Sequence, residues 1–246
     1  MYIWRNFFDK VKRYWPLEKF EKRGLLITII VLAFIFSFRE WGVEKFDIAI
    51  GIQNLLVSVV IVAAAFLVHE VAHRTVAVIN GYRSQYRAWV LGLVIGLVVA
   101  FVSNGHLLFL APGVLLITHF PQHRLGLKYH ELSMRHLGWI AMSGSVLLML
   151  FAVILKALAT ATGLQVFHKA MIVFIWISLF DMVPIPPFNG SRTFFGSRYI
   201  YVFVLGSLIG TAAMLVYLSG IVPIIGGIVL GALILLVFFV MIDKRW

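Results

Sequence analysis

Residues 48–79 read IAIGIQNLLVSVVIVAAAFLVHEVAHRTVAVI, an apolar run that is interrupted near its end by two histidines and a glutamate. On an α-helix, His69 and His73 are four residues apart and share one face, where both rings can bind a single metal ion. Glu70 lies beside them, in reach of a metal-bound water. Because ionisable side chains are costly in apolar surroundings, this placement indicates a metal, a proton path or a substrate cavity.

The composition indicates a membrane protein. Of the 246 residues, 62% are hydrophobic and only 13% are charged, and the mean hydropathy is +0.99. With about 20 residues needed to cross a bilayer, we predict an all-α membrane protein with about six transmembrane helices, in one domain that comprises residues 25–246. The six apolar stretches lie at about 25–42, 48–79, 137–159, 169–187, 199–219 and 221–242.

The apolar region 88–120 differs from these six stretches. It is interrupted by Ser103-Asn104-Gly105 and by Pro112-Gly113, and it is rich in Val, Ile and Leu. This pattern favours a β-rich, hairpin-like re-entrant element between the second and third helices. Other parts of the protein must cover that element, because strand edges cannot face lipid. Two short helices are the alternative.

Residues 1–24 form a basic and aromatic segment, which we interpret as a cytoplasmic or interfacial anchor on the lipid bilayer. The net charge of +11 then requires no nucleic acid as a partner. If the N-terminus is cytoplasmic and 88–120 returns to the side it left, 17 of the 21 Lys and Arg residues lie inside. We therefore expect a multi-pass protein of the cell membrane, with both termini cytoplasmic and the histidines in the cytoplasmic half.

A second motif ends the fourth apolar stretch, where residues 181–190 read DMVPIPPFNG. Proline removes a backbone donor and clashes with the preceding turn, so the helix must unwind here. Irregular backbone at membrane depth is tolerated where it lines a cavity or is packed in protein. Since Asp181 precedes the prolines, inside the apolar run, we interpret the segment as a second wall of the histidine site and less readily as an exit loop.

Together the two motifs resemble the site-2 protease family of intramembrane zinc metalloproteases, whose signature is HExxH in one helix and Asn-x-x-Pro...Asp-Gly in a later one. The resemblance covers about residues 48–198, and the stretch 108–113 is similar to that of archaeal members. It implies Zn²⁺ bound by His69 and His73, and Glu70 as the general base on a zinc-bound water. It also implies that 88–120 holds an extended segment of a transmembrane protein substrate.

Two features depart from the family pattern. Asn189 stands where the zinc-binding aspartate is expected, and Asp181 stands where the family has asparagine. An amide oxygen is a poorer zinc donor than a carboxylate, so the third metal ligand is left open between Asp181 and Asn189. Since the chain has no cysteine, a thiolate ligand is excluded. Leu148 stands where the family has a further polar asparagine.

Three functions are compatible with these residues. The first is an intramembrane zinc metalloendopeptidase that hydrolyses peptide bonds of transmembrane or membrane-proximal segments. The second is a protease-like protein that binds such segments without cutting them, as Asn189 and Leu148 suggest. The third is a small proton-coupled transporter that uses Glu70 and Asp181 as a relay.

Overall fold

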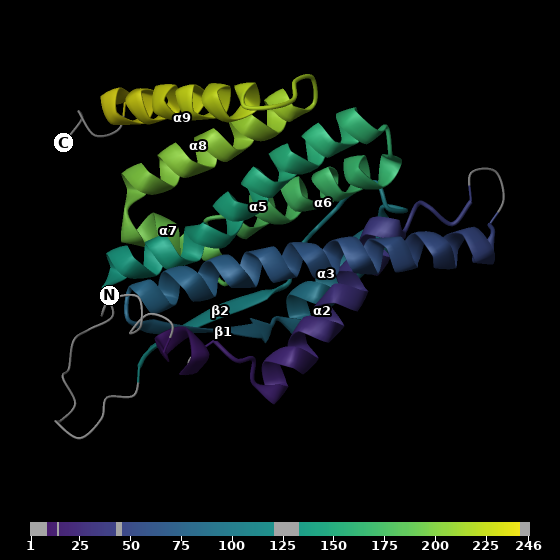
Figure 1. Ribbon diagram of the computed structural model, residues 1–246, viewed down its shortest axis with the longest axis horizontal. Coiled ribbons are helices and arrows are strands. Elements are labelled where there is room, and N and C mark those ends of the chain that lie inside the picture. Colours follow the sequence, from purple (N-terminus) through teal and green to yellow (C-terminus); the bar gives the residue numbers. More distant parts are fainter. Residues whose placement is uncertain (1–8, 14, 43–45, 121–132, 242–246) are drawn as a thin grey trace.

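The computed structural model describes residues 9–13, 15–42, 46–120 and 133–241 (Figure 1). This part of the chain is mostly helical, with one antiparallel pair of strands. Labelled as in Figure 1, its elements are α2 (Lys19–Ser37), α3 (Ile48–Ile79), β1 (Tyr82–Ala88), α4 (Val90–Val102), β2 (Gly113–His119), α5 (Met134–Thr162), α6 (Gln165–Asp181), α7 (Asn189–Gly196), α8 (Arg198–Leu215) and α9 (Val222–Met241).

Four of the described helices are long and apolar enough to cross a membrane, namely α3, α5, α8 and α9. Each of the other two predicted spans contains a helix with less apolar length. Helix α6 has 17 residues, and α2 begins with the charged sequence KFEKR, which leaves a short apolar remainder. The structure thus supports a membrane protein with four candidate spans. The terminal residues 1–8 and 242–246, on which the predicted topology depends, lie outside the described part.

Helix α3 is the longest described element, with 32 residues and a length of about 48 Å. It begins where the carboxylate of Asp47 accepts hydrogen bonds from the N–H groups of Ala49 and Ile50, at 2.8 and 3.2 Å. It ends before Gly81, whose φ of +82° suits glycine and turns the chain into β1. A helix of this length carries His69 and His73 to its last third.

The predicted β-rich element 88–120 is only partly extended. Strand β1 precedes it, and β1 pairs with β2 in antiparallel register, with Tyr86 opposite Leu115. The expectation of extended chain was wrong for residues 90–102, which form the 13-residue helix α4. A helix satisfies its backbone groups within the segment, which an uncovered strand in apolar surroundings cannot do. A re-entrant path for this element stays a prediction.

Two glycines explain how α4 fits beside the chain that leads into β2. A Cβ at Gly92 would lie 2.7 Å from the carbonyl oxygen of Ala111, and one at Gly96 would lie 2.6 Å from that of Phe109. The absent side chains therefore allow the helix and the extended segment to touch. Both glycines serve as contact points between the helix and that segment.

Helix α3 crosses the middle of the molecule (Figure 1). The two strands and α2 pack against it on one side, and α5 and α6 pack on the other, with α8 and α9 beyond α5. The main hydrophobic core includes Phe66 of α3, Leu148 of α5 and Phe174 of α6. This arrangement places the last third of α3 between the strands and the end of α6. The polar residues of both sequence motifs meet there.

Candidate metal and catalytic centre

His69 and His73 lie on one face of α3, as their spacing predicts, and both are buried. Their Nε2 atoms are 3.2 Å apart. The other ring nitrogen of His73, Nδ1, lies 2.7 Å from the backbone oxygen of Ile140 in α5. Since a carbonyl oxygen can only accept, Nδ1 carries the proton, and Nε2 presents its lone pair toward His69. A histidine fixed in this way is prepared to bind a metal through Nε2.

Asp181, the last residue of α6, brings a carboxylate to the two histidines. Its Oδ2 lies 3.2 Å from Nε2 of His69, and one donor atom from each of His69, His73 and Asp181 lies within 4.8 Å of the others. The hydroxyl of Ser145 in α5 donates to the same Oδ2 at 2.6 Å. Two imidazoles and one carboxylate form a known ligand set of catalytic zinc sites, and Ser145 holds the carboxylate in place.

Asn189, the first residue of α7, contacts Asp181 directly. Its Nδ2 donates to Oδ1 of Asp181 at 2.8 Å and lies 3.5 Å from Nε2 of His73. The two residues that are exchanged relative to the family pattern are therefore hydrogen-bonded partners. In this arrangement Asp181 presents the carboxylate to the histidines, and Asn189 supports it as a donor. The geometry favours Asp181 as the third ligand.

The contact between these two residues depends on the unwound segment between α6 and α7. Helix α6 ends at Asp181 and α7 begins at Asn189, so the proline-containing chain between them is not helical, as predicted. Eight residues of continuous helix would separate the two positions by about 12 Å. Because the chain folds back, both side chains reach the same point. Their direct contact was not evident from the sequence.

Helix α5 approaches the histidines at Gly144. A Cβ at this position would lie 2.5 Å from Nε2 of His73 and 2.6 Å from Nε2 of His69. Any larger residue at this position would collide with the Nε2 atoms of the two histidines. Sequence reasoning missed the roles of both Gly144 and Ser145, because no spacing rule connects α5 with the HExxH motif. The available signal was the family resemblance of the stretch 144–148, which drew attention to Leu148 and not to the glycine and serine at its start.

Glu70 is also buried, but its surroundings differ from those of Asp181. Within the described part of the chain, neither carboxylate oxygen of Glu70 has a hydrogen-bond partner. Oε2 lies 3.5 Å from Nε of Arg74, and Oε1 lies 4.0 Å from Nδ1 of His69. A buried carboxylate without hydrogen bonds is costly unless water or substrate contacts it. Glu70 is therefore the carboxylate of this centre that is available to exchange a proton.

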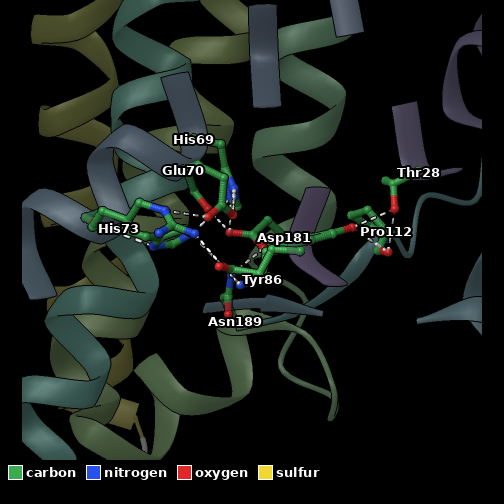
Figure 2. A network of polar contacts seen from close by, with 12 residues as sticks. Thr28, His69, Glu70, His73, Tyr86, Pro112, Asp181 and Asn189 are labelled. Carbon is green, nitrogen blue, oxygen red and sulfur yellow. Dashed lines mark hydrogen bonds and ion pairs between the residues drawn. The ribbon is translucent and has the colours of Figure 1, made fainter. Parts of the chain in front are cut away.

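A small cavity lies between α3 and the strands, beside the polar residues that Figure 2 labels. Its volume of about 10 Å³ has room for about one water molecule. His69, Glu70, His73, Asp181 and Asn189 line one part of it. Phe66 of α3, Ile177 of α6, Tyr86 and the chain from Pro112 to Leu115 complete the lining. Strand β2 thus forms a roof over the polar residues, and the cavity is too small for a peptide.

Tyr86 fastens this roof. Its hydroxyl donates to the carbonyl of Pro112 at 2.8 Å and lies 2.8 Å from Oγ1 of Thr28 in α2 (Figure 2). Burial raises the pKa of the Tyr86 phenol, which therefore keeps its proton and can donate. On the other side of the roof, Arg192 of α7 donates to the carbonyl of Leu115. These contacts tie α2, the strands and α7 together around the centre.

Comparison with known proteins supports a metalloprotease. The chain is 29% identical over 192 residues to a protein of Methanocaldococcus jannaschii named "Putative zinc metalloprotease MJ0611". That alignment covers 76% of this chain and 89% of the relative. No family model matches the chain, and no solved structure matches it. The name of the relative is consistent with the protease family that the two sequence motifs resemble.

Proposed function

We propose that this protein is an intramembrane zinc metallopeptidase of the site-2 protease type. The observation that carries the proposal is the buried group of His69, His73 and Asp181, whose donor atoms lie within 4.8 Å of one another. Glu70 lies beside this group with both oxygens lacking hydrogen bonds among the described residues. The printed name of the relative, which combines zinc with proteolysis, supports the same activity.

The residues of the centre fit a zinc ion. Two ligand atoms about 2.0–2.1 Å from one tetrahedral ion are about 3.3 Å apart. The distances of 3.2 Å from Nε2 of His69 to Nε2 of His73 and to Oδ2 of Asp181 agree with that value. Gly144 keeps the approach to both nitrogens clear. When bound, zinc supplies a Lewis acid and lowers the pKa of water to near neutrality.

The two buried carboxylates have different roles in the proposed hydrolysis. Asp181 accepts hydrogen bonds from Ser145 and Asn189, which hold its carboxylate in the position of a metal ligand. Glu70 has no such donors among the described residues and can accept the proton of the attacking water, which it then donates to the leaving amine. Glu70 is therefore the general base, and His69, His73 and Asp181 are the metal ligands.

The substrate that we propose is a transmembrane or membrane-proximal segment of another protein. The four candidate spans give the protein the apolar surface of a membrane protein, and β1 and β2 offer backbone groups that can pair with an extended chain. The cavity holds about one water molecule, so the roof must move before a peptide can enter. We further propose that both termini are cytoplasmic, from the charge asymmetry of the sequence.

The alternative of a binding protein without activity was motivated by the amide at position 189. Asp181 supplies a carboxylate across a 2.8 Å contact, and this supports an intact ligand set in place of an impaired one. A proton relay between Glu70 and Asp181 has no support from a contact between the two side chains among the described residues. Neither alternative is favoured by a specific observation.

Metal analysis and peptide cleavage by the purified protein test the proposal. The wild type is expected to hold about one zinc per chain and to cleave a transmembrane peptide in liposomes. Glu70→Gln should retain the zinc and lose about 10²- to 10⁴-fold in rate, which is the contribution of a general base. His73→Ala should lose both zinc and cleavage. Undiminished cleavage by Glu70→Gln would disprove the proposed mechanism.

A further inference from the structure

Arg74 places a buried positive charge beside Glu70. It is four residues after Glu70, on the same face of α3, and only 3% exposed. Its NH1 donates to the carbonyl of Trp15 at 2.8 Å, and its NH2 donates to Oε1 of Glu21 at 2.5 Å. Its Nε lies 3.5 Å from Oε2 of Glu70 without a hydrogen bond. Arg74 is thus anchored at its tip by NH1 and NH2, and its Nε faces Glu70.

Glu21 anchors Arg74 and is itself held from several directions. It lies in the first turn of α2 and is fully buried. Besides Arg74, its Oε1 accepts the backbone N–H of Tyr86 in β1 at 2.9 Å, and its Oε2 accepts that of Glu18 at 2.7 Å. A buried ion pair is destabilising unless further hydrogen bonds of this kind satisfy it. Glu21 therefore joins α2, the strand β1 and the charged end of Arg74 at one point.

The two carboxylates that face Arg74 are contacted unequally. Arg74 is hydrogen-bonded to Glu21 at 2.5 Å but lies 3.5 Å from Glu70. At the longer distance, Arg74 leaves both oxygens of the Glu70 carboxylate without a hydrogen bond among the described residues, so that water can contact them. Without Glu21, the guanidinium could turn and form two hydrogen bonds with Glu70. Those bonds would occupy the oxygens that a general base needs.

We propose that Arg74 is a positioning residue for the general base Glu70 and that Glu21 holds Arg74 at the distance this role requires. The inference rests on the proposed function, because it concerns the same reaction. It also connects the base to α2 and to β1, since Glu21 binds the backbone of Tyr86. The competing explanation is a structural ion pair that joins α2 to α3 and has no part in the chemistry.

Substitutions at Arg74 separate the two explanations when zinc content, kcat and KM are measured on the full-length protein with a transmembrane peptide. Arg74→Gln should lower kcat about 10- to 100-fold, as for other residues that support a metal site, with zinc content and KM unchanged. Arg74→Lys keeps the charge and should recover most of the rate. Arg83→Gln is the control. Arg83 forms an ion pair with Glu18 at 2.6 Å, which is partly exposed and does not include Glu70.

Glu21→Gln provides a second test that leaves Arg74 in place, in case Arg74→Gln does not fold. The amide oxygen can still accept the N–H of Tyr86, but the charge that holds Arg74 is lost. We expect kcat to fall while zinc content is retained. The double variant Glu21→Gln/Arg74→Gln should be no slower than Arg74→Gln alone, because residues that act as a unit are not additive.

Several results would overturn the inference. If zinc content and thermal stability fall together with kcat, KM rises, and Arg74→Lys restores none of them, the pair is only structural. The inference would also be disproved if cleavage depends on Glu70 but Arg74→Gln and Glu21→Gln leave its rate unchanged. The proposed function would still stand in that case. If the wild type and Glu70→Gln cleave the peptide at equal rates, the proposed function is disproved, and so is this inference.

Discussion

The two walls of the proposed metal centre hold their candidate ligands by different means. On α3, the helix backbone sets the distance between His69 and His73, and Ile140 fixes the ring of His73. On the opposite wall the backbone is unwound, and side chains hold the ligand. Asp181 is kept in place by Ser145 at 2.6 Å and by Asn189 at 2.8 Å. On α3 the four-residue spacing of His69 and His73 must therefore be kept. On the unwound wall, Asp181 and Asn189 can exchange places, because they contact each other directly.

The largest expected effect is on the exchanged pair itself. Asp181→Asn removes the only carboxylate of the ligand set and should lower zinc affinity by more than the roughly 10- to 100-fold typical of supporting residues. Asn189→Ala removes one donor to that carboxylate and should stay within that range. Metal analysis against a chelator of known affinity measures both.

The double variant Asp181→Asn/Asn189→Asp is the control for this comparison. It returns the carboxylate to the family's position across the same 2.8 Å contact, so zinc affinity should recover relative to Asp181→Asn. A wall that holds its ligand by side-chain contacts predicts this recovery. Loss of zinc in Asn189→Ala together with retention in Asp181→Asn would show that the amide is the ligand.

An intermediate effect is expected at Gly144, where α5 meets the helical wall. In Gly144→Ala the new Cβ would lie about 2.5 Å from Nε2 of His73, so the histidines or α5 must shift. Overpacking of this kind costs about 1–3 kcal/mol, and the shift should also weaken zinc binding. Thermal unfolding in detergent with and without zinc measures both effects.

Gly24→Ala in α2 is the matched control for that substitution. Its Cβ would meet Ala88 at 3.4 Å, an ordinary contact, and alanine is the better helix former. We expect unchanged or higher stability and unchanged zinc affinity. Equal behaviour of the two variants would mean that close approach of α5 to the histidines is unimportant.

The contrast between the walls also explains what the sequence could predict. The HExxH spacing was sufficient to place His69 and His73 together, because a helix has fixed geometry. The prolines were sufficient to predict the unwinding after Asp181. The choice between Asp181 and Asn189 was not predictable, since an irregular segment has no period from which the direction of a side chain follows. Ser145 was missed for the same reason, because only packing brings α5 to that carboxylate.

The segment between β1 and β2 also shows that local sequence does not determine every element. Residues 90–102 are apolar and rich in β-branched side chains, so local propensity favours strand. The structure has a helix there, because its backbone bonds close within the segment and two glycines allow it to touch the chain before β2. Tertiary contacts therefore determined that residues 90–102 form a helix. The paired strands lie on either side of it, at 82–88 and 113–119.

The smallest expected effect concerns the roof, which differs from both walls because it must move for a peptide to enter. Tyr86→Phe removes the hydroxyl that contacts Pro112 and Thr28 at 2.8 Å each. Each such bond contributes about 0.5–1.5 kcal/mol, so the closed roof should become less stable while the metal ligands are untouched. We expect unchanged zinc affinity, faster amide hydrogen exchange in β2 and a lower KM for peptide.

Thr28→Val removes one partner and should give a smaller change in the same direction. Unchanged exchange in β2 for Tyr86→Phe would mean that packing alone, including the Arg192 contact with Leu115, keeps the roof closed.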